Sequence, residues 1–335
     1  MGQPERIAIF AAAAKIQTAV GTPAVPTFAA NAIRLVGKNQ LTIDYIDKGD
    51  RADEQHAGMG VIGQGPKSGR YGQIDIAGPV MGGITDYFGG TVRPWWDPFI
   101  RGAGFSTTES GTTGSGIVTY TTLDDGTFEA FTLLLQSARQ LFTLQDCIAI
   151  PKLSAVAGGR PQWTFTVIGA MPNDAVDSTF AGQTLDFTAA PAFKGQTTSI
   201  GAFTSVTNGP CKMRKLDLDF GTAHTPRSSA GATDVYLGEV ITDRILNFSC
   251  EVEKVAKSVW DPEAISREPM PGGTDRKVNF QFGGAKFNEV KFSLGQFLFD
   301  TPVITDSSGL ATWPLKGKIQ ARSLTGGREI TIVVD

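Results

Sequence analysis

Apolar and polar residues alternate in short segments along most of the chain, a pattern typical of β-strands that bury one face. The clearest segments are residues 41–45 (LTIDY), 70–79 (RYGQIDIAGP) and 163–168 (WTFTVI). Other segments carry β-branched or aromatic residues at strand spacing, namely 116–122, 128–136, 140–148, 215–220, 234–237, 244–254, 277–282, 288–299 and 329–334. The pattern therefore predicts a mainly β protein.

Four segments interrupt this pattern. Residues 1–40 are turn-rich and predict an extended, weakly organised arm. Residues 47–68 are charged and glycine-rich, and they are too long for a plain hairpin turn. Residues 106–115 (STTESGTTGS) predict a surface loop, and residues 171–210, poor in charge, predict a connector between two halves of the chain.

Two Trp-Asp-Pro motifs predict two short helices. Asp97 and Asp261 are the expected N-caps, each followed by proline at the first helical position. Later in the chain, Gly295 interrupts an apolar strand and suggests a β-bulge.

Short matches suggest an internal repeat. Residues 41–45 (LTIDY) resemble 216–220 (LDLDF), and the strand 163–167 after a Gly-Gly pair resembles 278–282 after another. The two matches are offset by about 175 and about 115 residues, respectively. A single duplication would then need some sixty extra residues in the first copy, around 85–130.

Composition and charge argue against several classes of protein. The chain has 335 residues, 40 of them glycine, which suits many strands joined by tight turns. Thirty basic and 33 acidic residues give a net charge of −3, which disfavours a protein that grips a phosphate backbone. No apolar run is long enough to span a membrane. Glu5 and Lys15 flank the apolar stretch 7–14, so we expect no secretory signal and a cytoplasmic chain before assembly.

No catalytic, cofactor-binding or metal-binding signature is present, so we expect no enzyme, no cofactor and no metal. His56 lies in the polar loop, and His224 is expected in a turn, without a ligand-spaced partner. Three cysteines without CxxC spacing are expected to be buried, reduced thiols. They are Cys147, Cys211 and Cys250.

Two further pairs each have a structural and a functional interpretation. Asp217 and Asp219 would share one face of a strand, either as a plain polar outer face or as a pair for a cation or acid–base work. Trp95 and Trp96 would fill the core, or would form a platform on which a sugar stacks.

The order of the segments resembles the major tail proteins (tail tube proteins) of long, non-contractile-tailed bacteriophages, in the larger type with a duplicated tube domain. The resemblance covers nearly the whole chain, although the loop after Phe105 and the connector have no counterpart. It rests on the segments AKIQTAVGTPAVPTFAANAIRLV, LTIDYIDKGDRADEQHAGMGVIGQGPKSGRYGQIDIAG, WWDPFIRGAGF, RQLFTLQDCIAIPKLSAVAGGRPQWTFTVIGAM, MRKLDLDFGTAH, ITDRILNFSCEVE and FNEVKFSLGQFLFDTP.

This resemblance implies two tandem tail-tube-like domains, each a β-sandwich or barrel with a short flanking helix. The first would span residues 1–170, with an N-terminal arm and the long polar loop 47–68. The connector would span 171–210 and the second domain 211–335. Three copies would form a ring with pseudo-sixfold symmetry, and stacked rings would form the tail tube of the virion.

The implied partners follow from that role. They are further copies of the chain, the tape measure protein inside the tube, and the tail terminator and distal tail proteins at its ends. DNA would pass through the lumen without specific binding, so we expect a neutral to acidic lumen face. No membrane partner is expected.

The polar loop is the candidate contact between rings or subunits, since charged pairs there would set register between neighbours. The candidate residues are Asp47, Asp50, Arg51, Asp53 and Glu54. The loop could instead be an idle, solvated excursion. Two other functions stay open: a β-sandwich carbohydrate-binding or hydrolysing protein that uses Trp95, Trp96, Asp217 and Asp219, or another virion component such as a decoration or baseplate protein.

Overall fold

The fold is seen in a computed structural model. It describes residues 7–37, 39–47, 51–52, 63–64, 68–82, 93–123, 127–137, 139–183, 199–200, 203–204, 213–228, 236–268, 276–283, 288–321 and 329–335. Nearly all regular structure in the described residues is antiparallel β, which confirms the prediction of a mainly β protein.

The described residues of the first half form thirteen strands and one helix. They are β1 (Ile7–Ile9), β2 (Ala11–Ile16), β3 (Ala32–Ile33), β4 (Asn39–Asp47), β5 (Arg51–Ala52), β6 (Gly63–Gln64), β7 (Ser68–Pro79), α1 (Asp97–Arg101), β8 (Phe105–Ser110), β9 (Ile117–Thr122), β10 (Phe131–Gln136), β11 (Gln140–Val156), β12 (Gln162–Ala170) and β13 (Val176–Asp177).

In the second half, the part of the chain with described positions forms eleven strands and one helix. They are β14 (Ser199–Ile200), β15 (Phe203–Thr204), β16 (Met213–Asp219), β17 (Thr222–Ser228), β18 (Tyr236–Arg244), β19 (Asn247–Glu253), α2 (Pro262–Ser266), β20 (Lys277–Phe282), β21 (Val290–Phe299), β22 (Thr305–Ser307), β23 (Leu310–Gln320) and β24 (Ile330–Val334).

One strand order occurs in both halves. In the first, antiparallel neighbours run β4–β7–β12–β11–β10. In the second they run β16–β19–β23–β21–β20. Each half also inserts a two-stranded ribbon after its first strand, β5–β6 or β17–β18, and places its helix after its second.

At the level of whole strands, this correspondence agrees with the sequence match between residues 41–45 and 216–220, because residues 41–45 lie in β4 and residues 216–219 in β16. It disagrees with the second match. The strand that contains Trp163 corresponds to β23, with its own buried Trp313, and not to β20. Among the described residues, the hairpin β8–β9 has no counterpart in the second half. It lies within residues 85–130, where an insertion was expected.

Backbone pairing joins the two halves in two places. β16 adds to the C-terminal part of β11, and β24 adds to β9. A continuous run therefore reads β4–β7–β12–β11–β16–β19–β23–β21 across the molecule. In the described part of the expected connector, β13 pairs with β11 and β14 with β20.

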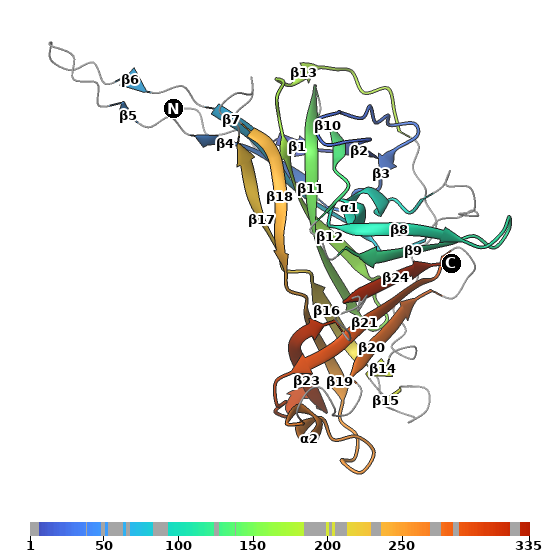
Figure 1. The fold of residues 1–335 in the computed structure, drawn as a ribbon. Coiled ribbons are helices and arrows are strands. Elements are labelled where there is room, and N and C mark those ends of the chain that lie inside the picture. The colour runs from blue at the N-terminus through green and yellow to red at the C-terminus, as the bar shows by residue number, and fades with distance from the viewer. Residues whose placement is uncertain are drawn as a thin grey trace.

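The β17–β18 ribbon crosses from one half to the other. Figure 1 shows it rising from the second half toward the end of β7. β18 contacts β7, β11 and β12. There β11 and β12 bury Ile148 and Ile168, although both alternate with core residues and so point to the outer face. The ribbon therefore covers a local apolar patch on that face.

The core is one continuous cluster of aromatic and aliphatic side chains from both halves. Trp163 lies near its centre, with ring contacts to Trp96, Phe220 and Phe292. Aromatic burial on this scale is the main favourable contribution to folding.

Gly295 forms the predicted bulge. It lies between Leu294, which pairs with β24, and Gln296, which pairs with β23, and the register against β20 shifts at the same point. A Cβ here would lie 2.1 Å from the backbone oxygen of Gln320, so only glycine lets β21 change partners at this residue.

Several local predictions were wrong. The expected arm contains β2, whose Ala11–Ala14 stretch is buried against β10, because alanine gives no polar alternation to read. Residues 105–110 form strand β8 rather than a loop, since β9 pairs with them. The long strand β23 was not predicted; lysine and proline interrupt its apolar pattern.

Candidate functional site

The eight-stranded run has one buried face and one polar face. On β16, Leu216 and Leu218 are buried, whereas Asp217 and Asp219 between them are partly exposed. The same alternation continues on the neighbouring strands. We call the outward side the open face; its residues include Asp44, Gln73, Asp75, Lys152, Ser154, Thr164, Thr166, Lys215, Asp217, Asp219, Asn247, Ser249, Glu251, Lys316 and Lys318.

Opposite charges neutralise one another on the open face. Lys152 Nζ lies 3.0 Å from Asp219 Oδ2 across the join of the halves. Lys215 Nζ lies 2.8 Å from Asp217 Oδ2, and this hydrogen bond raises the pKa of Lys215. The result is a surface of small polar groups with acidic and basic side chains nearly in balance.

These pairs decide between the two interpretations of Asp217 and Asp219. The predicted polar outer face is confirmed, and each carboxylate pairs with a lysine instead of converging on a common ligand. Among the residues with described positions, no three His, Cys, Asp or Glu side chains gather as a metal site would require.

The tryptophan pair belongs to the core. Trp96 is fully buried and donates its indole N–H to Met81 O at 2.8 Å. Trp95 is half-buried, donates to Pro79 O at 2.9 Å and packs against Phe165. Both lie on the side of the sheet away from the two aspartates, so the structure does not assemble the sugar site that the four residues would form.

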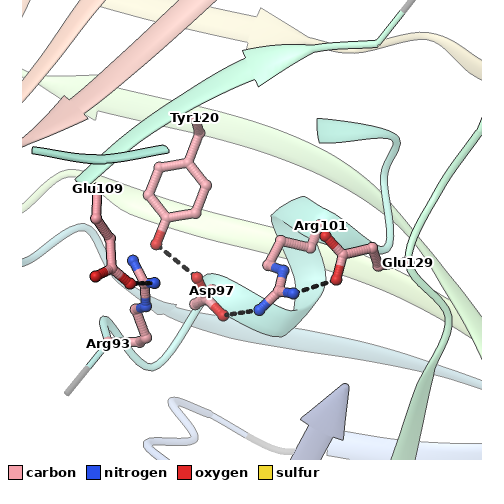
Figure 2. Close-up of polar contacts among 6 residues, drawn as sticks. All are labelled: Arg93, Asp97, Arg101, Glu109, Tyr120 and Glu129. Atoms are coloured by element: carbon pink, nitrogen blue, oxygen red, sulfur yellow. Dashed lines mark hydrogen bonds and ion pairs between the residues drawn. The ribbon is translucent and has the colours of Figure 1, made fainter. Parts of the chain in front are cut away.

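A cluster of charged side chains surrounds helix α1 (Figure 2). Asp97 is buried; its Oδ1 accepts a hydrogen bond from Tyr120 Oη at 2.7 Å, and its Oδ2 lies 3.4 Å from Arg101. Arg101 also pairs with Glu129, and nearby Arg93 pairs with Glu109. The cluster ties the helix to hairpin β8–β9 and to the loop before β10.

This geometry corrects the expected helix cap. Trp96 occupies the N-cap of α1 without a side-chain cap bond, and Asp97 is the first helical residue. Burial raises the pKa of the Asp97 carboxyl, while the Arg101 charge and the Tyr120 hydrogen bond oppose that shift. A buried acid that is fully engaged by its neighbours serves to position the helix.

The second helix follows the prediction. Asp261 is the N-cap of α2, and its Oδ1 accepts from the backbone N–H groups of Glu263 and Ala264 at 3.1 and 3.2 Å. Trp260 before it packs edge-on against the buried Trp313.

The other sequence candidates fall in different places. His224 lies on strand β17, not in a turn, with Nδ1 3.0 Å from Glu239 Oε2. Cys147 and Cys250 are buried and form no disulfide, as predicted, and burial raises the pKa of the Cys147 thiol well above its usual value. His56 and Cys211 lie outside the described residues.

The polar loop is described only in part. Asp47 ends β4, with its backbone opposite Ser68, and Arg51 lies on the short strand β5. Asp50, Asp53 and Glu54 lie outside the described residues. The predicted contact role of these five residues therefore stays a prediction.

Sequence reasoning missed the open face as a unit. Alternation in each strand shows which side chains point outward, but it cannot show that β11 and β16 adjoin and extend one polar surface across both halves. The fold and this face define a mainly antiparallel β protein built on a repeated strand order.

No protein-family model matches the chain, and no curated protein matches it in sequence. Within the described part of the chain, none of the helices has the length and apolar character needed to cross a membrane.

Proposed function

We propose that this protein is a phage tail tube protein, a structural virion component that polymerises as stacked rings. Its two tandem tube-like units would be the two halves that share one strand order. In the ring they would give three copies pseudo-sixfold symmetry. The tube would enclose the tape measure protein and later form the channel for DNA ejection, with terminator and distal tail proteins at its ends.

The observation that carries the proposal is the repeated strand order joined into one sheet with a polar face. Each half contributes four strands to the continuous sheet, and the two sets of four pair edge to edge through β11 and β16. Strand pairing of the same kind can also join separate chains, and heterologous contacts between chains close into rings. Closure also removes the exposed strand edges that a long sheet would otherwise present.

The open face has the properties expected of a lumen. Acidic and basic side chains are nearly balanced on it, and Lys152 and Lys215 each pair with an aspartate, which offsets the positive charge of these two lysines. A surface that bound phosphate groups would stall the passage of DNA. We therefore place the open face toward the channel.

The competing functions have less support. The carbohydrate-binding alternative needs exposed tryptophans, and its candidate tryptophans belong to the core. A decoration or baseplate protein could share the fold, and the shape of the assembly distinguishes it from a tube.

Negative-stain electron microscopy of the purified protein over a range of concentrations tests the proposal. We expect rings with threefold or sixfold symmetry, or hollow tubes with a regular axial repeat. A monodisperse monomer at every concentration would contradict the proposal and make a glycan-binding screen the next measurement. Closed particles or isolated discs without a channel would favour another virion component.

A further inference from the structure

Hairpin β8–β9 is an addition to the repeated strand order. Among the described residues it has no counterpart in the second half, and the tail-tube resemblance does not cover its connecting loop either. An element that only one half possesses cannot supply a contact that all six units of the proposed ring make alike. The hairpin is therefore a candidate for a purpose apart from ring formation.

The base of the hairpin is held by contacts within one chain. β9 pairs with β24 of the second half over residues 118–121. Tyr120 donates to the buried Asp97 at 2.7 Å (Figure 2). Arg244, at the end of the β17–β18 ribbon, donates to Leu123 O at 3.2 Å, just after β9. The hairpin therefore belongs to the junction between the two halves of the same chain.

The hairpin lies on the side of the core away from the open face. Trp163 of β12 projects into the core, because it alternates with the outward Thr164. Trp96 packs against Trp163 with ring centroids 6.0 Å apart, and Tyr120 of the hairpin packs against Trp96 at 5.1 Å. The core thus separates the hairpin from the open face. If the open face lines the channel, the hairpin faces the outside of the tube.

The far end of the hairpin extends beyond the core. Figure 1 shows it projecting from the body of the molecule. Residues 108–115 are all exposed, and none of them has an apolar side chain. Thr112 O accepts from Ser115 N at 2.8 Å, and the hydroxyl oxygens of these two residues lie 3.0 Å apart. This turn lacks the apolar centre that is typical of a contact between proteins.

We propose that hairpin β8–β9 stands on the outer surface of the assembled tube and presents residues 110–115 to large molecules in the surroundings. This inference rests on the proposed tube function, and it depends on the open face lining the channel. The hairpin gives each copy an accessible attachment point without altering the contacts between copies.

Cysteine labelling of the full chain tests this placement. Thr113→Cys places a thiol at the tip, and Ser154→Cys places one on the open face, where Ser154 is exposed. The probe is a maleimide coupled to a globular carrier protein, and wild type gives the background from the native cysteines. Thr113→Cys should react as fast in tubes as in unassembled chains. Ser154→Cys should lose most of its reactivity on assembly, because the probe can enter the channel only at the tube ends.

The labelling pattern distinguishes the hairpin placement from the tube function. Loss of Thr113→Cys labelling in tubes, with Ser154→Cys also protected, would overturn the outward placement of the hairpin and leave the tube function intact. Ser154→Cys that reacts equally before and after assembly would contradict the channel position of the open face, and the hairpin placement with it. Wild-type protein that forms no rings or tubes contradicts the tube function itself.

An insertion at the tip gives an independent measurement. An epitope peptide between Thr113 and Gly114 should leave the thermal midpoint and the concentration needed for assembly unchanged, because residues 108–115 are exposed to solvent. An antibody against the epitope should then decorate the tubes along their length in electron micrographs. A folded variant that no longer assembles, or tubes whose epitope the antibody does not reach, would overturn the proposal.

Discussion

At the scale of single residues, Asp97 shows how burial changes what a side chain does. A Trp-Asp-Pro motif normally predicts a solvent-facing N-cap, and Asp261 fulfils that prediction. Asp97 lies instead between α1 and β9, because Tyr120 and Arg101 offer it partners inside the protein. The Trp-Asp-Pro motif therefore places its aspartate at an N-cap in α2 and inside the protein in α1. The packing around each helix determines which of the two occurs.

The raised pKa of Asp97 predicts a pH dependence of stability. A carboxyl whose pKa is higher in the folded than in the unfolded chain stabilises the fold when protonated. That contribution is lost as the pH rises from about 3.8 through the folded-state pKa. Asp97→Asn cannot ionise, so wild type should lose stability relative to this variant between pH 4 and pH 7.

Urea unfolding of both proteins at the two pH values measures this effect. Asp300→Asn is the control, since Asp300 is exposed and its substitution should give no such trend. A wild type that gains stability relative to Asp97→Asn toward pH 7 would show that attraction to Arg101 outweighs burial.

At the scale of elements, the strands were predictable wherever one face is buried and the other solvated. Residues 277–282 alternate strictly and form β20 within the predicted bounds. β2 escaped prediction because Ala11–Ala14 is buried throughout, and periodicity cannot mark such a strand. β17 escaped because its pattern resembles a turn, and it gains its structure from pairing with β18.

Helix α2 offers a direct test of a predicted cap. Asp261→Ala removes the acceptor for two N–H groups and should lower the free energy of unfolding by about 1 kcal/mol. Asp261→Asn keeps an acceptor oxygen and should restore most of that loss. Urea unfolding of the three proteins provides the measurement, and equal stability of Ala and Asn variants would mean that the cap bond contributes nothing.

At the scale of the whole molecule, the repeated strand order is the feature from which the proposed function follows. In the proposed tube it would make one chain equivalent to two units, so that a ring of three copies would contain six. Charge on the open face would then act on what passes through the ring, whereas charge in the loops would act on assembly.

The polar loop supplies a test at this scale. Replacement of Asp50, Arg51 and Asp53 by alanine should leave the circular dichroism spectrum and thermal midpoint unchanged and should impair the growth of tubes, since charged pairs in the loop would set register between neighbours. Electron microscopy of the variant measures tube length and frequency. Tubes of normal length would mean that the loop is an idle excursion.

The sequence by itself determined the β class, the two short helices, the bulge at Gly295 and the outward position of Asp217 and Asp219. All of these follow from local alternation and from the backbone preferences of single residues. Tertiary structure alone decided the burial of Asp97, the equivalence of β12 with β23 and the junction of β11 with β16. These depend on which distant segments pair. The alternation pattern of a strand shows which face is buried, but it does not specify which other strand it pairs with.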